Sequence, residues 1–237
     1  MNMEKNSPLS CANLDEVNRM KQEKNILSLD AAFGPACACL IRQDARQFYV
    51  SSQSNKPHSQ TILPMLETLL AEAELNWKDV QLLGLGIGPG SFTGLRVAAA
   101  TMTGINADLR LPMLGFSSLA ITARQSSVRE PMWVIEDARA GSAWLGRYQE
   151  GMPLEEDRSQ PWDEVRCIPA DTYLTQTPTT VDLPGWEQLP LELPRCKALA
   201  ILTCQQASKV ANPDILSRFA SPAYLSPSQA ERNAQKG

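Results

Sequence analysis

The chain has 237 residues, and its 43% hydrophobic and 20% charged side chains are typical of an ordinary globular protein with one domain or two small lobes. No apolar run approaches the length of a membrane span, so we expect no membrane segment. The net charge is −4 and the lysines and arginines do not cluster, which argues against a chain that binds nucleic acid by itself through a basic face.

The sequence begins with a polar stretch. Residues 1–24 mix both charges and have no apolar centre, so we expect an N-terminal extension and not a secretion signal. The six cysteines include no C-x-x-C pair and no zinc spacing, which predicts reduced thiols in the cytoplasm and no metal. Cys37 and Cys39 alternate in a strand-like run and should face the core together.

Residues 25–126 are expected to form a first lobe in which strands and helices alternate. Ser59, Ser91 and Ser117 each stand where a hydroxyl could cap the start of a helix. Strands are predicted at residues 25–29, 36–41, 48–51, 81–87 and 112–115, and helices at residues 59–73, 91–107 and 117–123.

Residues 127–225 are expected to form a second, smaller lobe. It opens like the first, with an apolar strand, an acidic residue, a turn and a returning strand at residues 132–135 and 143–148. Such an internal echo predicts two lobes built on one plan. Further along we predict an irregular segment at residues 151–194, a helix at residues 198–210 that can pack back on the first lobe, a short helix from Pro213 and a disordered tail at residues 226–237.

The most informative stretch is residues 83–96, which read LGLGIGPGSFTGLR. An apolar strand runs into a turn at residues 88–90, whose glycines can adopt a positive φ, and a helix follows. The spacing fits neither G-x-G-x-x-G, nor a P-loop, nor G-x-S-x-G. We therefore favour a tight strand-to-helix turn with close backbone packing over phosphate binding.

The alternative for the same turn is an anion or nucleotide site. Free N–H groups and the helix dipole point into a turn between a strand and a helix start, so such turns attract negative charge. The candidate contacts are Gly90, Ser91 and Thr93, together with the two carboxylates Asp30 and Asp137 at the ends of the first strand of each lobe.

Residues 86–96, GIGPGSFTGLR, resemble the signature of the TsaB (YeaZ) family of bacterial proteins of tRNA threonylcarbamoyladenosine synthesis. Three further matches keep the order of that family, and the resemblance covers residues 26–225. It implies the actin/hexokinase/Hsp70-like (ASKHA) fold, a duplicated two-lobe α/β architecture with which the predicted order of elements agrees. The further matches are His58-Ser59 followed by Leu63-Pro64, then Asp137-Ala138-Arg139, and then Pro222-Ala223-Tyr224-Leu225.

The resemblance implies a non-catalytic subunit. With a TsaD-like catalytic subunit and a TsaE-like ATPase, the chain would scaffold and activate the transfer of a threonylcarbamoyl group to the adenosine next to the anticodon of tRNAs that decode ANN codons. It would meet tRNA only through this complex, hold no cofactor and form a homodimer when alone. The alternatives are a stand-alone hydrolase of the glycoprotease type, a small-molecule kinase of the same fold, or a regulatory homodimer.

The residues themselves argue against an enzyme. TsaD-like relatives bind a metal with paired histidines at H-x-x-x-H spacing, whereas His58 is the single histidine here. Ala31 and Ala32 stand where nucleotide-binding members of the fold follow the first-strand aspartate with a hydroxyl or a glycine. Asp137 is expected to form an internal pair with Arg139 that holds the hairpin of the second lobe.

Two helices of the first lobe are the better functional lead. Leu63 and Met65 are apolar and lie off the main stripe of the first helix, while small residues in the second helix let another helix approach closely. Burial inside this same chain is the alternative, and the sequence leaves both open. Because these helices pair with TsaD or with a second TsaB in the family, the resemblance implies an interface at Leu63, Met65, Leu69, Arg96, Ala99, Met102 and Thr103.

Overall fold

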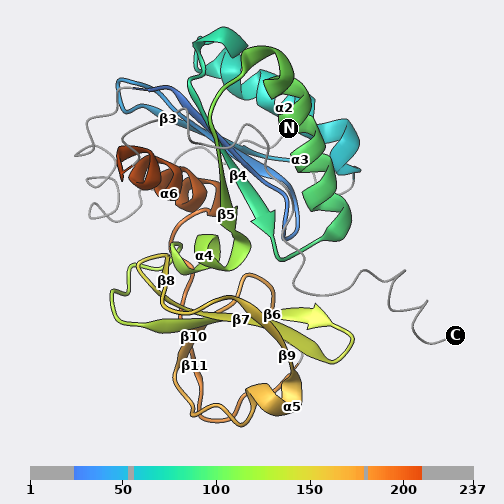
Figure 1. Ribbon diagram of the computed structural model, residues 1–237, viewed down its shortest axis with the longest axis vertical. Helices are drawn as coiled ribbons and strands as arrows, with labels where there is room; N and C mark the ends of the chain where they lie inside the picture. The colour runs from blue at the N-terminus through green and yellow to red at the C-terminus, as the bar shows by residue number, and fades with distance from the viewer. Residues whose placement is uncertain (1–23, 53–55, 179–180, 210–237) are drawn as a thin grey trace, which may run out of the picture.

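The computed structural model describes residues 24–52, 56–178 and 181–209, which form two α/β lobes stacked along the long axis (Figure 1). The first lobe contains a five-stranded sheet in the order β3-β2-β1-β4-β5. Strands β1, β2 and β3 are antiparallel neighbours, whereas β4 and β5 run parallel to β1. The strands are β1 (Ile26–Asp30), β2 (Cys37–Ile41), β3 (Gln47–Ser51), β4 (Leu82–Gly88) and β5 (Met113–Ser117).

Helices cover both faces of this sheet. The helices α2 (His58–Glu72) and α3 (Phe92–Leu109) lie together on one face, and α6 (Arg195–Lys209) lies on the other (Figure 1). Leucines of β1 and β4 pack against α2 and α3, while Cys37 and Cys39 pack against α6 with Cys196 and Cys204. The last described helix therefore completes the core of the first lobe. The short elements η1 (Trp77–Asp79) and α4 (Ser118–Ala123) lie before β4 and after β5.

The second lobe repeats the first sheet in reduced form. Its strands follow the order β11-β10-β6-β7, and β8 and β9 share the far edge of β7. The hairpin of β6 and β7 is antiparallel, and β10 and β11 run parallel to β6, as β4 and β5 do to β1. The elements are β6 (Met132–Arg139), β7 (Ser142–Gln149), β8 (Met152–Pro153), β9 (Arg158–Pro161), α5 (Trp162–Val165), β10 (Thr172–Leu174) and β11 (Glu187–Gln188).

Most expected elements are confirmed, and in the first lobe their ends differ from the structure by only one or two residues. Ser91 and Ser117 cap their helices, since each side chain accepts a hydrogen bond from a backbone N–H. The expectation for Ser59 is wrong. The helix begins at His58 after Pro57, whose carbonyl accepts a hydrogen bond from the backbone N–H of Gln60 at 3.0 Å, so no side-chain cap is needed.

The expectation of an irregular segment at residues 151–194 is also wrong, because it contains β8 to β11 and α5. These strands have two to four residues each and are held by pairing with β6, β7 and one another, so no local periodicity announces them. The expected helix from Pro213, the motif at residues 222–225, the tail at residues 226–237 and nearly all of the N-terminal extension lie outside the described residues. Within the described part, no helix is long and apolar enough to cross a membrane.

The start of α3 lies tightly against the end of β1. A Cβ atom added to Gly94 would overlap the backbone oxygen of Ala31, whereas one added to Gly104, on the exposed side of the same helix, would meet open space. The glycine at residue 94 is therefore required by packing, and the one at residue 104 is not.

This difference gives a matched test of the packing. Gly94→Ala should lower the free energy of unfolding by roughly 1–3 kcal/mol, because the backbone at Ala31, directly after β1, has to move. Gly104→Ala should raise it by about 0.4–1 kcal/mol, because alanine restricts the unfolded chain and favours helix. Urea denaturation of both variants measures the effects, and equal effects of the two substitutions would contradict this account of the β1–α3 contact.

Candidate functional site

The glycine turn between β4 and α3 is packed from within the chain. The backbone N–H of Ser91 donates to the carbonyl of Ala32 at 2.8 Å, and the Ser91 hydroxyl accepts from the N–H of Gly94 at 3.2 Å. A Cβ atom on Gly90 would lie 2.8 Å from that of Ala32. These contacts use the N–H groups of Ser91 and Gly94, which an anion could otherwise bind, and they favour the packing interpretation of this turn. Thr93 is exposed on the first turn of α3.

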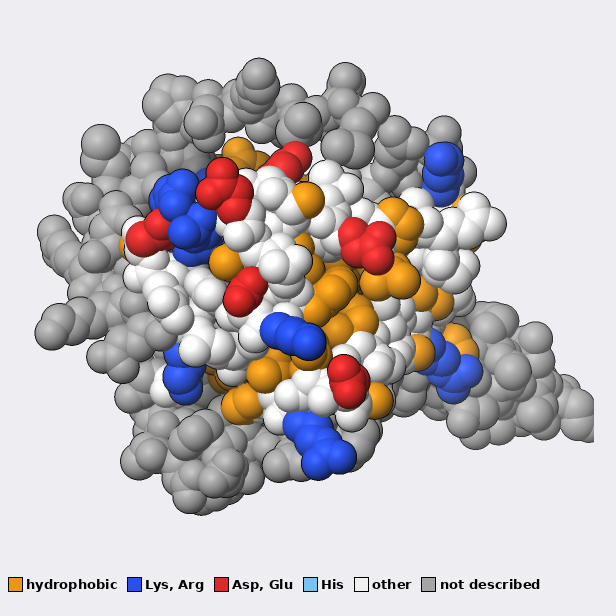
Figure 2. Space-filling model, turned by 90° about the horizontal axis from the view of Figure 1, so that it is seen from above, with side chains coloured by type: hydrophobic (Ala, Val, Ile, Leu, Met, Phe, Trp, Pro, Cys, Tyr) orange, Lys and Arg blue, Asp and Glu red, His pale blue; other side chains and the backbone are white. Residues whose placement is uncertain are grey.

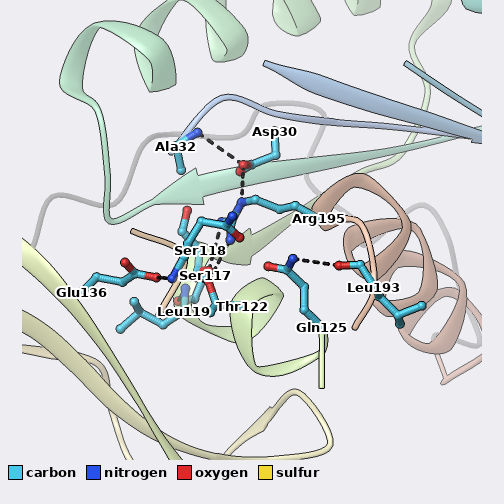
Figure 3. A network of polar contacts seen from close by, with 11 residues as sticks. Asp30, Ala32, Ser117, Ser118, Leu119, Thr122, Gln125, Glu136, Leu193 and Arg195 are labelled. Atoms are coloured by element: carbon cyan, nitrogen blue, oxygen red, sulfur yellow. Dashed lines mark hydrogen bonds and ion pairs between the residues drawn. The ribbon is translucent and has the colours of Figure 1, made fainter. Parts of the chain in front are cut away.

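The end of β1 instead holds a buried ion pair (Figure 3). The Nε atom of Arg195 donates to Asp30 Oδ2 at 2.6 Å, and only 6% and 1% of these two side chains are exposed. The same carboxylate oxygen accepts the backbone N–H of Ala32 at 3.3 Å. Asp30 therefore faces an arginine that begins α6, 165 residues further along the chain.

The rest of the Arg195 guanidinium is also occupied. Its Nη1 atom donates to the hydroxyl of Thr122 at 2.8 Å, and its Nη2 atom donates to the carbonyl of Ser118 at 3.0 Å. The ring centroid of Phe33 lies 4.9 Å from the guanidinium carbon. One side chain thus joins β1, α4 and the turn after β1 to the start of α6.

Glu136 on β6 is the buried carboxylate of the second lobe. It accepts hydrogen bonds from the backbone N–H of Gln176 at 2.6 Å and from the hydroxyls of Thr175 and Thr177 at 3.1 and 3.0 Å. Burial raises the pKa of Glu136, while these hydrogen bonds and the positive charge of Arg195 oppose the rise. Glu136 therefore holds the segment after β10 in place through hydrogen bonds, and it lies close enough to Arg195 to feel its charge.

Asp137, the residue singled out from the sequence, has a smaller role. Its Oδ1 atom accepts the backbone N–H of Arg139 at 2.7 Å, at the bulge of the β6–β7 hairpin. This hydrogen bond goes to the backbone of Arg139 and is not the pair of opposite charges expected from the sequence. Sequence reasoning missed Glu136 and Arg195. Available signals were a charged residue inside an otherwise apolar strand and an arginine directly after Pro194, at the start of a helical pattern.

A second polar cluster lies where β5 meets the second lobe. The hydroxyls of Ser117 and Tyr148 both donate to the carboxylate of Asp157. Burial raises the pKa of Asp157, and burial beside that carboxylate raises the pKa of Tyr148 above its ordinary value. The cluster ties the segment before β9 to the junction of the two lobes.

The structure divides the predicted interface residues into two groups. Met65, Leu69, Ala99 and Met102 are buried in the core between the helices and the sheet, so the expectation that they form an outer surface is wrong. Their spacing matches the stripe that binds the sheet. Arg96 and Leu63 are exposed, and Thr103 is half-buried.

The outer face of α2 and α3 nevertheless carries apolar surface. We call it the helix face and define it by the exposed residues Leu63, Phe92, Arg96 and Ala100. Figure 2 shows hydrophobic side chains gathered at the middle of this end of the molecule, with single charged groups around them. The Arg96 guanidinium lies 3.6 Å from the ring centroid of Phe92. A hollow of about 400 Å³ lies beside the starts of both helices, where His58 is half-buried.

Comparisons with known proteins agree with this architecture. A family model described as "TsaD: tRNA N6-adenosine threonylcarbamoyltransferase" matches residues 50–161. The protein "tRNA threonylcarbamoyladenosine biosynthesis protein TsaB" of Escherichia coli (strain K12) is 32% identical over 128 residues, which cover 52% of this chain and 54% of that protein. Its counterpart in Buchnera aphidicola subsp. Acyrthosiphon pisum (strain APS) is 26% identical over 142 residues, covering 54% and 64%. The chain thus spans between about half and two thirds of the length of these curated relatives.

Among solved structures, YeaZ from Pseudomonas aeruginosa matches with a TM-score of 0.64 at 23% identity, covering 85% of this chain and all of that chain. The repeated strand order and this likeness define a two-lobed protein of the actin/hexokinase/Hsp70-like fold. The chain is thus similar to proteins named TsaB over about half of its sequence, and to YeaZ over most of its fold.

Some proteins of this fold bind a nucleotide between their lobes, but the residues at this position of the chain do not suit nucleotide binding. The Asp30 carboxylate is already bound to Arg195, and Ala31 and Ala32 supply no hydroxyl for a phosphate. The ring of Phe33 contacts that of Trp144 on β7, with 6.4 Å between their centroids. The two lobes therefore meet where phosphates would have to enter. In the part of the chain that the structure describes, no three His, Cys, Asp or Glu side chains come together as metal ligands.

The half-buried carboxylate of Asp157 predicts a pH effect on stability. Because its pKa is raised in the folded chain, folding gains from its protonated form below the ordinary value of about 3.9, and this gain is lost as the pH rises through the folded pKa. Asp157→Asn removes the titrating group. Relative to the wild type, the variant should therefore become more stable as the pH rises above about 4.

Urea denaturation at a series of pH values measures this difference. Asp163→Asn is the control, because 92% of that side chain is exposed. A stability difference between Asp157→Asn and the wild type that stays constant with pH would contradict the assignment.

Proposed function

We propose that this chain is a non-catalytic, partner-binding subunit of the machinery that makes threonylcarbamoyladenosine in tRNA. Its partners would be a TsaD-like catalytic subunit and a TsaE-like ATPase, in the cytoplasm. The printed names of the sequence relatives support the pathway. The net charge of −4 supports a subunit that leaves the binding of tRNA to its partners.

The filled cleft between the lobes is the observation that carries the proposal. The catalytic machinery of an ASKHA enzyme would need an open cleft with unpaired carboxylates, but Asp30 is paired with Arg195, and the positive charge of Arg195 also acts on Glu136. The single histidine of the chain, His58, lies at the start of α2 and takes no part in this network. Both facts favour a scaffold over a hydrolase or a kinase.

The helix face is the surface through which the scaffold would act. It presents an exposed leucine and phenylalanine beside a stacked arginine, and large apolar and arginine side chains are the residues that dominate protein interfaces. The underlying residues Leu69 and Met102 are buried in the core, which supports a face that would change little in shape on binding. A TsaD-like subunit would dock here, and a second copy of this chain would occupy the same face when that subunit is absent.

A single charge on the helix face tests this proposal. Leu63→Glu should weaken binding to a TsaD-like subunit by about tenfold or more, because the carboxylate would be desolvated at the interface. The stability of the isolated chain should stay the same, since 43% of the Leu63 side chain is exposed. Surface plasmon resonance with the purified partner measures the affinity, and light scattering measures self-association.

Leu154→Glu is the matched control, because that leucine is 50% exposed and lies in the second lobe after β8. We expect this variant to bind like the wild type. Equal binding of the Leu63 variant and the wild type would place the interface elsewhere, and weakening by both variants alike would show that the effect does not depend on the helix face.

A further inference from the structure

Arg195 occupies the centre of the junction between the lobes. Its side chain is 6% exposed and pairs with Asp30 at the end of β1. Glu136 on β6, the equivalent strand of the second lobe, lies within its electrostatic reach, and the Thr122 hydroxyl contacts both side chains. A buried cation in such a setting is stable only where its partners satisfy all of its polar groups. Here all three guanidinium nitrogens donate hydrogen bonds.

The same guanidinium supports the contact across the cleft. Phe33, in the turn after β1, packs with its ring centroid 4.9 Å from the guanidinium carbon and contacts Trp144 of the second lobe. Without the cation, the ring would lose the group that it covers, and the turn would lose its contact to α6. Closure of the cleft and the position of the start of α6 are therefore linked through one side chain.

The carboxylate of Asp30 could accept more hydrogen bonds than it does. Within the described structure, Asp30 Oδ1 has no hydrogen-bond partner, although it is buried against Gly86. A carboxylate can accept two parallel hydrogen bonds from a guanidinium, and here it uses only one oxygen. The site is thus a buried carboxylate whose geometry suits a planar, multidentate cation, and the guanidinium of the same chain fills this place.

We propose that Arg195 is an internal ligand, which occupies the cleft in place of an external one and holds the two lobes closed. The cleft opens only when the first turn of α6 leaves its place. Nucleotides are excluded by this occupation, whichever partner the helix face binds. The inference therefore goes beyond the proposed scaffold function and does not depend on it.

Chemical rescue tests the proposal on the full chain. Arg195→Ala removes the atoms that correspond to ethylguanidinium and leaves a cavity lined by Asp30, Thr122 and the Ser118 carbonyl. We expect a lower melting temperature in this variant, and a rise when millimolar ethylguanidinium is added. Ethylammonium, which has the same charge without the planar fork, should restore much less. Wild-type protein and Arg129→Ala, whose side chain is 85% exposed, should not respond to either cation.

Hydrogen exchange gives a second readout that does not depend on the stability of the alanine variant. Arg195→Lys keeps the charge but cannot reach all three acceptors. Amides at residues 31–36 and 140–144 should exchange about tenfold faster in this variant, while those of α2 and α3 stay unchanged, because only a local opening is favoured. Unchanged exchange in those two segments, or equal rescue by ethylguanidinium and ethylammonium, would overturn the proposal.

Discussion

The structure depends on the ion pair between Arg195 and Asp30. Burying two charges is costly, and such a pair persists only where the surroundings satisfy the remaining donors. Thr122 and the Ser118 carbonyl do this from α4, which packs between the two sheets. The pair thereby joins the end of the first strand, the junction of the lobes and the last described helix, and these three elements enclose the cleft.

The two lobes share the same arrangement of their first strands but differ in the length of their helices. In each, an acidic residue on the first strand is bound near the strand that runs parallel to it. Asp30 lies against Gly86 of β4, and Glu136 accepts hydrogen bonds from residues 175–177, directly after β10. The crossover helix of the second lobe, α5, has only four residues, whereas its counterpart in the first lobe, α2, has fifteen. Among the described residues, two long helices side by side on one sheet face occur only in the first lobe, and this is the face that we propose as the partner-binding surface.

The sequence predicted what local chemistry determines. The glycine turn, the Ser91 cap and the apolar stripes of the first-lobe helices follow from propensity and spacing over a few residues. The position of Arg195 could not be predicted in this way, because its partner lies 165 residues away and a solvent-exposed helix start would look the same. Met65 and Ala99 were misassigned for a related reason. Periodicity shows that a residue belongs to an apolar stripe, but it does not tell a core from an interface.

Titration of the isolated wild-type chain with magnesium ATP and with ADP in a calorimeter tests the central claim most directly. Because an arginine from the chain itself occupies the cleft, we predict no saturable heat from either nucleotide. Saturable binding of one nucleotide per chain, with protection of the amides at residues 31–36 and 140–144, would show that the cleft is open to ligands and would contradict the account.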